Sequence, residues 1–431
     1  MDSSDGLQVT RPRYSTLFAG GLALLTVLLL AAAVALGHTS EPRGKTVLTV
    51  RLWDAQVAAA YRQSLDEFTR RHPGIEVRVN VVAYSSYFDT LRTDVAGGGA
   101  DDIFWISNAY LSGYADNGRL MPIQPSAGWE PSVVAQFSRG GELWAVPQLT
   151  DAGIAVYYNA DLLARASVDP AELNSLRWDP DPAVDTLRPL LARLTGPRQW
   201  GYNAANDLQG IYLNYIGSAG GVFQQGDRFA FDNPEAATAF RYLVALINRD
   251  RVAPPAADTN NNGDFSRNQF LAGRMALFQS GTYNLAAIAG QADFHWGVAM
   301  LPAGPAGRVS VTNGIAAAGN SATKHPEAVR QVLAWLGSAE GNAFVGADGA
   351  AIPAVLAAQR TYFDYWSRRG VDVGPFFRVL DGPRIPAPGG SGFAAGYQVI
   401  TPLFDEMFLG RAPVESTLAQ AQAAANTAAS G

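Results

Sequence analysis

Acidic and amide residues stand at the ends of several apolar stretches that are typical of strands. Asp54 follows one such run, Asn108 follows a second, and Asp151 precedes a third, Ile154–Tyr158. Carboxylates and amides form hydrogen bonds, and neighbouring aromatic rings offer apolar faces. This mixture predicts recognition of a small polar ligand in a cleft.

Motifs for bond-breaking chemistry are few. The four histidines are scattered without metal-ligand spacing, and there is no G-x-S-x-G nucleophile motif. Gly97–Gly99 has no following Lys-Ser or Lys-Thr, so it is interpreted as a loop and not as a phosphate cradle. Tyr157 and Tyr158 are adjacent on a predicted strand and point to opposite faces, which argues against iron ligation. The sequence leaves open whether two carboxylates form a glycosidase pair, because such a pair is defined by its separation in the folded structure and not by its spacing in the sequence.

Composition limits the class of protein. The 431 residues are 48% hydrophobic, which is enough for a large core and for two or three domains. The 32 basic and 38 acidic side chains give a net charge of −6 and form no concentrated basic face, which argues against a nucleic-acid partner. The absence of cysteine excludes disulfides, thiolate metal sites, cysteine nucleophiles and a thioether lipid anchor.

The N-terminal residues predict export. Arg11 and Arg13 precede the uncharged run Leu17–Leu36, which is long enough to cross a bilayer as a helix. Residues 1–36 are therefore expected to be a signal sequence or a membrane anchor, with cleavage and retention both open. Residues 37–45 are polar and predict a linker to a body outside the membrane.

Folding is expected to begin at Thr46 with a buried strand. The apolar spacing of Val57, Tyr61, Leu65 and Phe68 then predicts an amphipathic helix, and a second strand follows. Strand, helix and strand within forty residues form the unit of a parallel α/β sheet. Ligands of such sheets bind beyond the carboxyl ends of the strands.

The stretch Gly141–Leu163 is expected to organise the molecule. It predicts a short strand, a buried strand at Ile154–Tyr158, and a helix capped by Asn159. Such a stretch can leave one lobe and enter another, which would put Asp151 at the junction. An ordinary core strand with a capped helix is the alternative.

Eight motifs follow one another in order along the chain, namely LTVRLWD, FTRRHPGIEVRV, GGGADDIFWISNAYLSGYADNGRLMPI, GELWAVPQLTDAGIAVYYNADLL, DNPEAATAFRYLVALI, FLAGRMALFQSGTYN, HWGVAMLPAGP and NGIAAAGNSATKHPEAVRQVLAWLGSAEG. Together they resemble family 1 extracellular solute-binding proteins, the maltose-binding-protein-like carbohydrate receptors of ABC importers. The resemblance implies an α/β, two-lobed, type II periplasmic-binding-protein fold, with three crossing segments and a cleft between the lobes. Lobe I is expected at 46–150 and 281–313, and lobe II at 151–280 and 314–431.

The resemblance, together with residue chemistry, gives a set of expected ligand contacts. Trp105, Asn108 and Asp151 match positions that line the sugar cleft of maltose-binding relatives. Gly281 would let a ligand approach the backbone, and Tyr283 would offer a stacking face. For each residue a purely structural role is the alternative. The expected set is Asp54, Tyr84, Trp105, Asn108, Tyr110, Asp151, Asn206, Asp207, Tyr212, Gly281, Tyr283, Gly314, Arg384, Phe393 and Tyr397.

The expected ligand is a di- or oligosaccharide or an amino sugar, without cofactor, metal or catalysis. The resemblance implies a monomer that delivers this ligand to the permease subunits of an ABC importer with a cytoplasmic ATPase. Two alternatives stay open, namely an exported glycosidase or polysaccharide lyase and a receptor for glycerophosphodiesters. The latter would need more positive charge than the cleft candidates supply.

Overall fold

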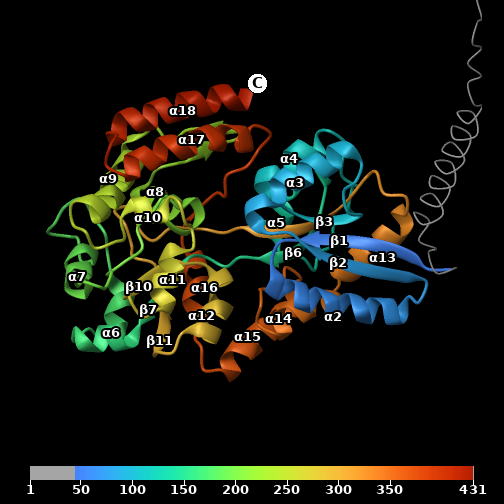
Figure 1. Cartoon of the computed structure of the whole chain (residues 1–431), viewed down its shortest axis with the longest axis horizontal. Helices are drawn as coiled ribbons and strands as arrows, with labels where there is room; N and C mark the ends of the chain where they lie inside the picture. The colour runs from blue at the N-terminus through green and yellow to red at the C-terminus, as the bar shows by residue number, and fades with distance from the viewer. Residues whose placement is uncertain (1–43, 431) are drawn as a thin grey trace, which may run out of the picture. The chain divides into compact units, whose positions relative to one another are not determined.

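Two separate β-sheets organise the chain, and the computed structural model describes residues 44–430. The first sheet has the order β2 (Ile75–Val81), β1 (Thr46–Leu52), β3 (Ile103–Ser107), β13 (Gly314–Gly319) and β6 (Val146–Thr150). β1 and β3 are parallel, whereas β13 is antiparallel to both β3 and β6. One face carries α2 (Ala55–Arg71), α13 (Pro326–Leu336) and α14 (Ala339–Ala347), and the other carries α3 (Tyr84–Gly97), α4 (Asn108–Ala115) and α5 (Pro131–Gln136) (Figure 1).

The second sheet is antiparallel and has three strands. β7 (Ala155–Asn159) lies between β10 (Leu277–Ser280) and β11 (Trp296–Ala299). A group of packed helices accompanies it, namely α8 (Leu213–Ala219), α9 (Pro234–Asn248), α17 (Phe393–Phe408) and α18 (Val414–Ser430) (Figure 1). The other α-helices are α6 (Ala160–Arg165), α7 (Leu187–Leu194), α10 (Ala256–Thr259), α11 (Phe265–Leu271), α12 (Leu285–Gln291), α15 (Gln359–Arg368) and α16 (Gly374–Arg378).

Short elements complete the described chain. Three two-stranded ribbons pair β4 (Ser138–Arg139) with β5 (Glu142–Leu143), β8 (Gln224–Gln225) with β9 (Arg228–Phe229), and β12 (Ser310–Val311) with β14 (Arg384–Ile385). The 3-10 turns are η1 (Pro170–Ser175), η3 (Thr282–Asn284), η4 (Leu356–Ala358) and η5 (Val379–Asp381), and η2 (Leu208–Tyr212) is a π-helical turn.

The chain passes three times between apolar cores that surround the two sheets, as the predicted two-lobed fold requires. The first passage joins β6 to β7, and the second joins β12 to β13. The third runs from Ala358, which packs in the core around the first sheet, to Tyr362, which packs in a core beside the second sheet. We call the body around the first sheet lobe I and the body around the second lobe II.

The predicted lobe boundaries after Gly281 are wrong. β11 pairs with β7, so residues 281–313 lie in lobe II and not in lobe I. β13 pairs with β3 and β6, so the chain returns to lobe I at Gly314 and not to lobe II. The reason is that both strands are short and apolar, and nothing in such a strand specifies which sheet it joins.

Helix starts follow the capping residues closely. The predicted cap Asn159 accepts a hydrogen bond from Leu162 N at 3.0 Å, and Asn233 accepts one from Ala236 N at 2.8 Å. Two other helices begin without a side-chain cap, α3 at Tyr84 and α17 at Phe393.

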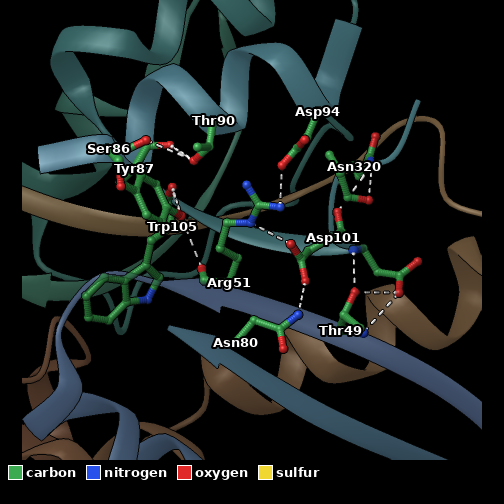
Figure 2. A network of polar contacts seen from close by, with 12 residues as sticks. Thr49, Arg51, Asn80, Ser86, Tyr87, Thr90, Asp94, Asp101, Trp105 and Asn320 are labelled. Carbon is green, nitrogen blue, oxygen red and sulfur yellow. Dashed lines mark hydrogen bonds and ion pairs between the residues drawn. The ribbon is translucent and has the colours of Figure 1, made fainter. Parts of the chain in front are cut away.

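A buried ion network fixes α3 and β3 to β1 (Figure 2). The Arg51 guanidinium contacts Asp101 at 2.5 Å and Asp94 of α3 at 2.6 Å. Tyr87 of α3 donates from its hydroxyl to the carbonyls of Trp105, at 2.9 Å, and Arg51, at 3.2 Å. These bonds hold the first turn of α3 beside the ends of β1 and β3, where the site residues stand.

The predicted signal or anchor at 1–36, and all but the last two residues of the linker at 37–45, lie outside the described residues. From residue 44 to residue 430, no helix has the length and apolar character needed to span a membrane.

Replacing Asp101 by alanine tests the ion network. The side chains of Arg51 and Asp101 are only 10% and 6% exposed, and removing one partner of a buried pair leaves a charge that is poorly compensated. We expect Asp101→Ala to lower the free energy of unfolding by about 3 kcal/mol in urea titrations.

Asp89→Ala is the matched control, because Asp89 pairs with Arg92 on the exposed side of α3. Its unfolding curve should stay close to that of the unaltered protein. Equal curves for both variants would contradict a stabilising role for the network.

Candidate functional site

A cleft of about 890 Å³ opens where β1 and β3 end and where the first two crossing segments meet. Lobe I lines it with the β1–α2 and β3–α4 junctions and with the start of α3. Lobe II lines it with η2, η3 and the first turn of α17. The position agrees with the expectation that ligands bind beyond the carboxyl ends of parallel strands.

Most of the residues expected at the site converge on this cleft, although they are spread over 344 positions of sequence from Asp54 to Tyr397. The residues that the structure brings together are Asp54, Tyr84, Trp105, Asn108, Tyr110, Asp151, Asn206, Asp207, Tyr283, Gly314, Phe393 and Tyr397.

Three expected residues do not line the cleft. Tyr212 is fully buried in the lobe II core and reaches the site only through its hydroxyl contact with Tyr397, at 3.4 Å. Arg384 is exposed on β14 and donates to the carbonyl of Leu380 at 3.1 Å. Both corrections reflect side-chain direction, because a residue's type and position in the chain do not fix the face on which it lies.

Gly281 is the third correction. The ring of Tyr283 occupies the space where a side chain at Gly281 would lie, and the Gly281 carbonyl accepts a hydrogen bond from Tyr157 at 2.8 Å. The glycine therefore makes room for an aromatic ring of the protein, and not for the backbone approach of a ligand that we expected.

An aromatic wall forms the lobe I side of the cleft. The Trp53 ring makes edge contacts with Trp105, Tyr87 and Tyr84, at centroid distances of 4.9, 4.9 and 5.7 Å. Trp105 is fully buried and donates its ring N–H to the Tyr61 hydroxyl at 2.9 Å, so it backs the wall. We did not predict Trp53, although its place beside Asp54 at the end of β1 was a usable signal.

Rings that face the open cleft come from both lobes. Tyr84 is 63% exposed and Tyr283 is 42% exposed. In lobe II, the half-buried Tyr397 stacks on Phe393, one helical turn away and only 5% exposed, with ring centroids 5.4 Å apart. Exposed aromatic faces of this kind suit the C–H surfaces of a ligand.

The charged lining is acidic. Asp54, Asp151, Asp207 and Asp264 face one basic residue, Arg267, which is already paired with Asp264 at 2.9 Å. The cleft therefore presents uncompensated negative charge, which favours ligands rich in hydrogen-bond donors or carrying a positive charge.

Helix capping fixes two of these acids. Asp54 Oδ1 accepts from the backbone N–H groups of Gln56 and Val57, at 2.8 and 3.1 Å. Asp207 Oδ1 accepts from Gly210 N at 2.9 Å, at the start of η2. In each case the second oxygen is left out of the cap. Asp207 is open to the cleft, yet desolvation by the enclosing protein raises its pKa.

Asp151 stands between the first two crossing segments. Its backbone N–H donates to the Asn313 carbonyl at 2.8 Å, and its carbonyl accepts from Thr312 Oγ1 at 2.5 Å. Its Oδ2 accepts from Gln209 Nε2 at 3.1 Å. Burial raises the pKa of Asp151 to about 6, and the hydrogen bond from Gln209 opposes the rise.

Two amides of the expected set are engaged with lobe II. Asn108 Nδ2 reaches from lobe I to the carbonyls of Ala387 and Pro388, at 3.4 and 3.2 Å. Asn206 Nδ2 donates to Asp405 of α17 at 2.8 Å. Both residues line the cleft, but these bonds also give them a structural role. The described residues hold no cluster of three or more His, Asp or Glu side chains suited to a metal ion.

The sequence profile of the bacterial extracellular solute-binding proteins matches residues 54–343. The chain belongs to this family. Proteins of the family bind substrates, and the resemblance drawn from the sequence is thereby confirmed. An uncharacterised lipoprotein of Streptomyces antibioticus is 28% identical to this solute-binding protein over 316 residues, which cover 68% of this chain and 66% of the relative. The match thus spans just under two thirds of that relative's length.

Solved structures agree with the assignment. UspC of M. tuberculosis is 72% identical, with a TM-score of 0.74, and the match covers 89% of this chain and all of UspC. Lmo0181 of Listeria monocytogenes, an ABC substrate-binding protein in complex with cycloalternan, has a TM-score of 0.78 at 19% identity, covering 89% and 98% of the two chains. The solute-binding protein therefore has the two-lobed fold of sugar receptors of ABC transporters.

The buried charge of Asp151 should make stability depend on pH. Its pKa rises from about 3.9 in the unfolded chain to about 6, so the folded protein takes up a proton as pH falls from 7 to 4. Asp151 therefore destabilises the fold above about pH 6, and protonation relieves this effect at lower pH. We expect Asp151→Asn, which keeps an acceptor for Gln209, to melt at a higher temperature than the unaltered protein near pH 8.

The difference in melting temperature should shrink near pH 5. A difference that stays constant between these two pH values would show that the carboxyl of Asp151 does not titrate in this range.

Proposed function

We propose that this protein captures a carbohydrate in the cleft between its lobes and delivers it to the permease of an ABC importer. The observation that carries the proposal is the convergence of carboxylates, amides and exposed aromatic rings on one cleft lined from both lobes. Hydroxyl groups around a sugar ring suit the carboxylates and amides, and its C–H faces suit the rings. Sugar-bound relatives of the same fold support the choice of ligand class.

An amino sugar is the more specific proposal. Three acids of the cleft, Asp54, Asp151 and Asp207, have no basic partner among the cleft-lining residues, because Arg267 pairs with Asp264. A protonated amine would neutralise part of this charge. A phosphorylated ligand would add one or two like charges to an acidic lining, where the guanidinium of Arg267 is already paired with Asp264.

Ligand capture is expected to favour closure of the lobes, since a bound sugar would contact both. We also propose that residues 1–36 take the protein out of the cytoplasm and, if retained, hold it at the membrane. The related Streptomyces lipoprotein supports an exported location. The present chain lacks the cysteine of a lipid anchor, so attachment would depend on the apolar run.

Calorimetry with three classes of sugar tests the ligand. We expect binding of neutral oligosaccharides such as maltotriose or of amino sugars such as glucosamine and its dimer, and none of glucose 6-phosphate. Preference for the phosphorylated sugar would contradict the proposal. Incubation with the same oligosaccharides should release no products, and turnover would favour the alternative of an exported glycosidase or lyase.

Asp151→Ala tests the central acid. We expect at least a tenfold weaker affinity for the sugar that binds best, equal to about 1.4 kcal/mol, with an unchanged circular dichroism spectrum. Arg384→Ala is the control, because Arg384 lies on β14 outside the cleft and should leave affinity unchanged. Equal affinities for Asp151→Ala and the unaltered protein would remove Asp151 from the site.

A further inference from the structure

Asp151 is an acid of the cleft whose carboxylate accepts a hydrogen bond from a neutral lobe II side chain, that of Gln209. Its backbone is fixed by the second crossing segment, through Asn313 and Thr312. Its carboxylate is fixed separately, by the contact between Oδ2 and Gln209 Nε2 at 3.1 Å. Among the side chains that the structure describes, none forms a hydrogen bond with the other oxygen, Oδ1. That oxygen is thus available to a ligand in the cleft that Asp151 lines.

Gln209 is itself held by a rigid support. It belongs to η2, whose neighbouring Gly210 donates to the Asp207 cap at 2.9 Å and accepts from Gln279 Nε2 at 2.7 Å. The Gln209 carbonyl accepts from Asn214 Nδ2 at 2.8 Å. A side chain at Gly210 would collide with the Asp207 carboxylate, so the glycine allows this tight arrangement. π-Helical turns of this kind are frequent at functional sites.

Gln279 ties this support to the second sheet. It lies on β10, is 1% exposed, and exchanges backbone hydrogen bonds with the Asn203 side chain at 2.7 and 2.9 Å. The path from β10 through Gly210 to Gln209 is therefore made of short hydrogen bonds between buried or half-buried groups. It holds the backbone from which the Gln209 side chain reaches Asp151.

We propose that Gln209 is a positioning residue for ligand binding, whose amide orients the Asp151 carboxylate and keeps it available as an acceptor. The proposal rests on the proposed function in taking Asp151 as a ligand contact. An amide is suited to this task because it donates to one carboxylate oxygen without neutralising the charge, as an arginine or lysine would. Its own Oε1 is a further acceptor, so the pair favours ligands that donate, such as vicinal hydroxyls or an ammonium group.

The titratable groups around Asp151 do not stabilise its ionised carboxylate. Its titratable neighbours are Tyr84 on α3, Tyr283 on η3 and Tyr362 on α15. Asp207 is also close to Tyr84 and Tyr283. All of these are acids, and Arg267, the basic residue of the lining, is paired with Asp264. Without the Gln209 amide, the carboxyl would therefore bind its proton more tightly.

Titration of the Asp151 carboxyl by ¹³C NMR tests the proposal without any ligand. The protein carries ¹³C in its aspartate carboxyls, and the Asp151→Asn spectrum assigns the signal. We expect Gln209→Met, which keeps the length but loses the donor, to raise the midpoint by about one pH unit, a tenfold change in proton affinity. Gln209→Leu also lacks the donor, adds no charge and should raise the titration midpoint as well, which provides a second variant if the first folds poorly.

Gln56→Met is the matched control, because Gln56 is an exposed glutamine that lines the same cleft from lobe I and makes no bond to Asp151. Its midpoint should equal that of the unaltered protein. A midpoint that also stays unchanged in folded Gln209→Met and Gln209→Leu would overturn the proposal.

Calorimetry with glucosamine then separates this proposal from the proposed function. If glucosamine binds the unaltered protein, Gln209→Met should weaken the affinity for glucosamine about tenfold, and Gln56→Met should weaken it less. Equal affinities of Gln209→Met and the unaltered protein would count against a role for Gln209. If glucosamine does not bind the unaltered protein, the amino-sugar proposal fails, whereas the NMR midpoints still decide the role of Gln209.

Discussion

The hydrogen bonds among the crossing segments are the constraint on which the site depends. Thr150 N donates to the Ile352 carbonyl at 3.0 Å, Asp151 N donates to the Asn313 carbonyl at 2.8 Å, and the β6–β13 pairing ends with Thr150 opposite Gly314. Backbone groups buried at such a junction need partners, and here the segments supply them to one another. Two lobes with separate cores are thereby joined at a small region beside the cleft.

The lobe I side of the cleft is a supported surface. Trp53 rests against Trp105 and Tyr87, and Tyr87 is bonded to the carbonyls of Arg51 and Trp105. The ion pair of Arg51 with Asp94 binds α3 to β1, and its ion pair with Asp101 holds the residues just before β3 (Figure 2). Rings held in this way lose little conformational freedom when a ligand stacks on them, which lowers the entropic cost of binding.

The lobe II side supplies charge and adjustable hydrogen bonding. Asp207 caps the π-helical turn that carries Gln209, and Asp151 contacts Gln209 from the first crossing segment. A carboxylate at this depth is desolvated and is costly to keep ionised, so its single amide partner has a large influence on it. The acidic lining and the open rings together match the chemistry of donor-rich ligands with apolar faces.

The sequence by itself determined the first βαβ unit and the cap at Asn159, because capping is local and because parallel strands bring Asp54 and Asn108 to one edge of a sheet. Its resemblance to a known family implied the two-lobed class and most of the residues that line the cleft. Only the tertiary structure decided which sheet receives β11 and β13, since strand pairing is non-local. It also decided that Tyr212 turns into the core and Gln209 toward Asp151, because a π-helical turn breaks the 3.6-residue period from which side-chain direction is predicted.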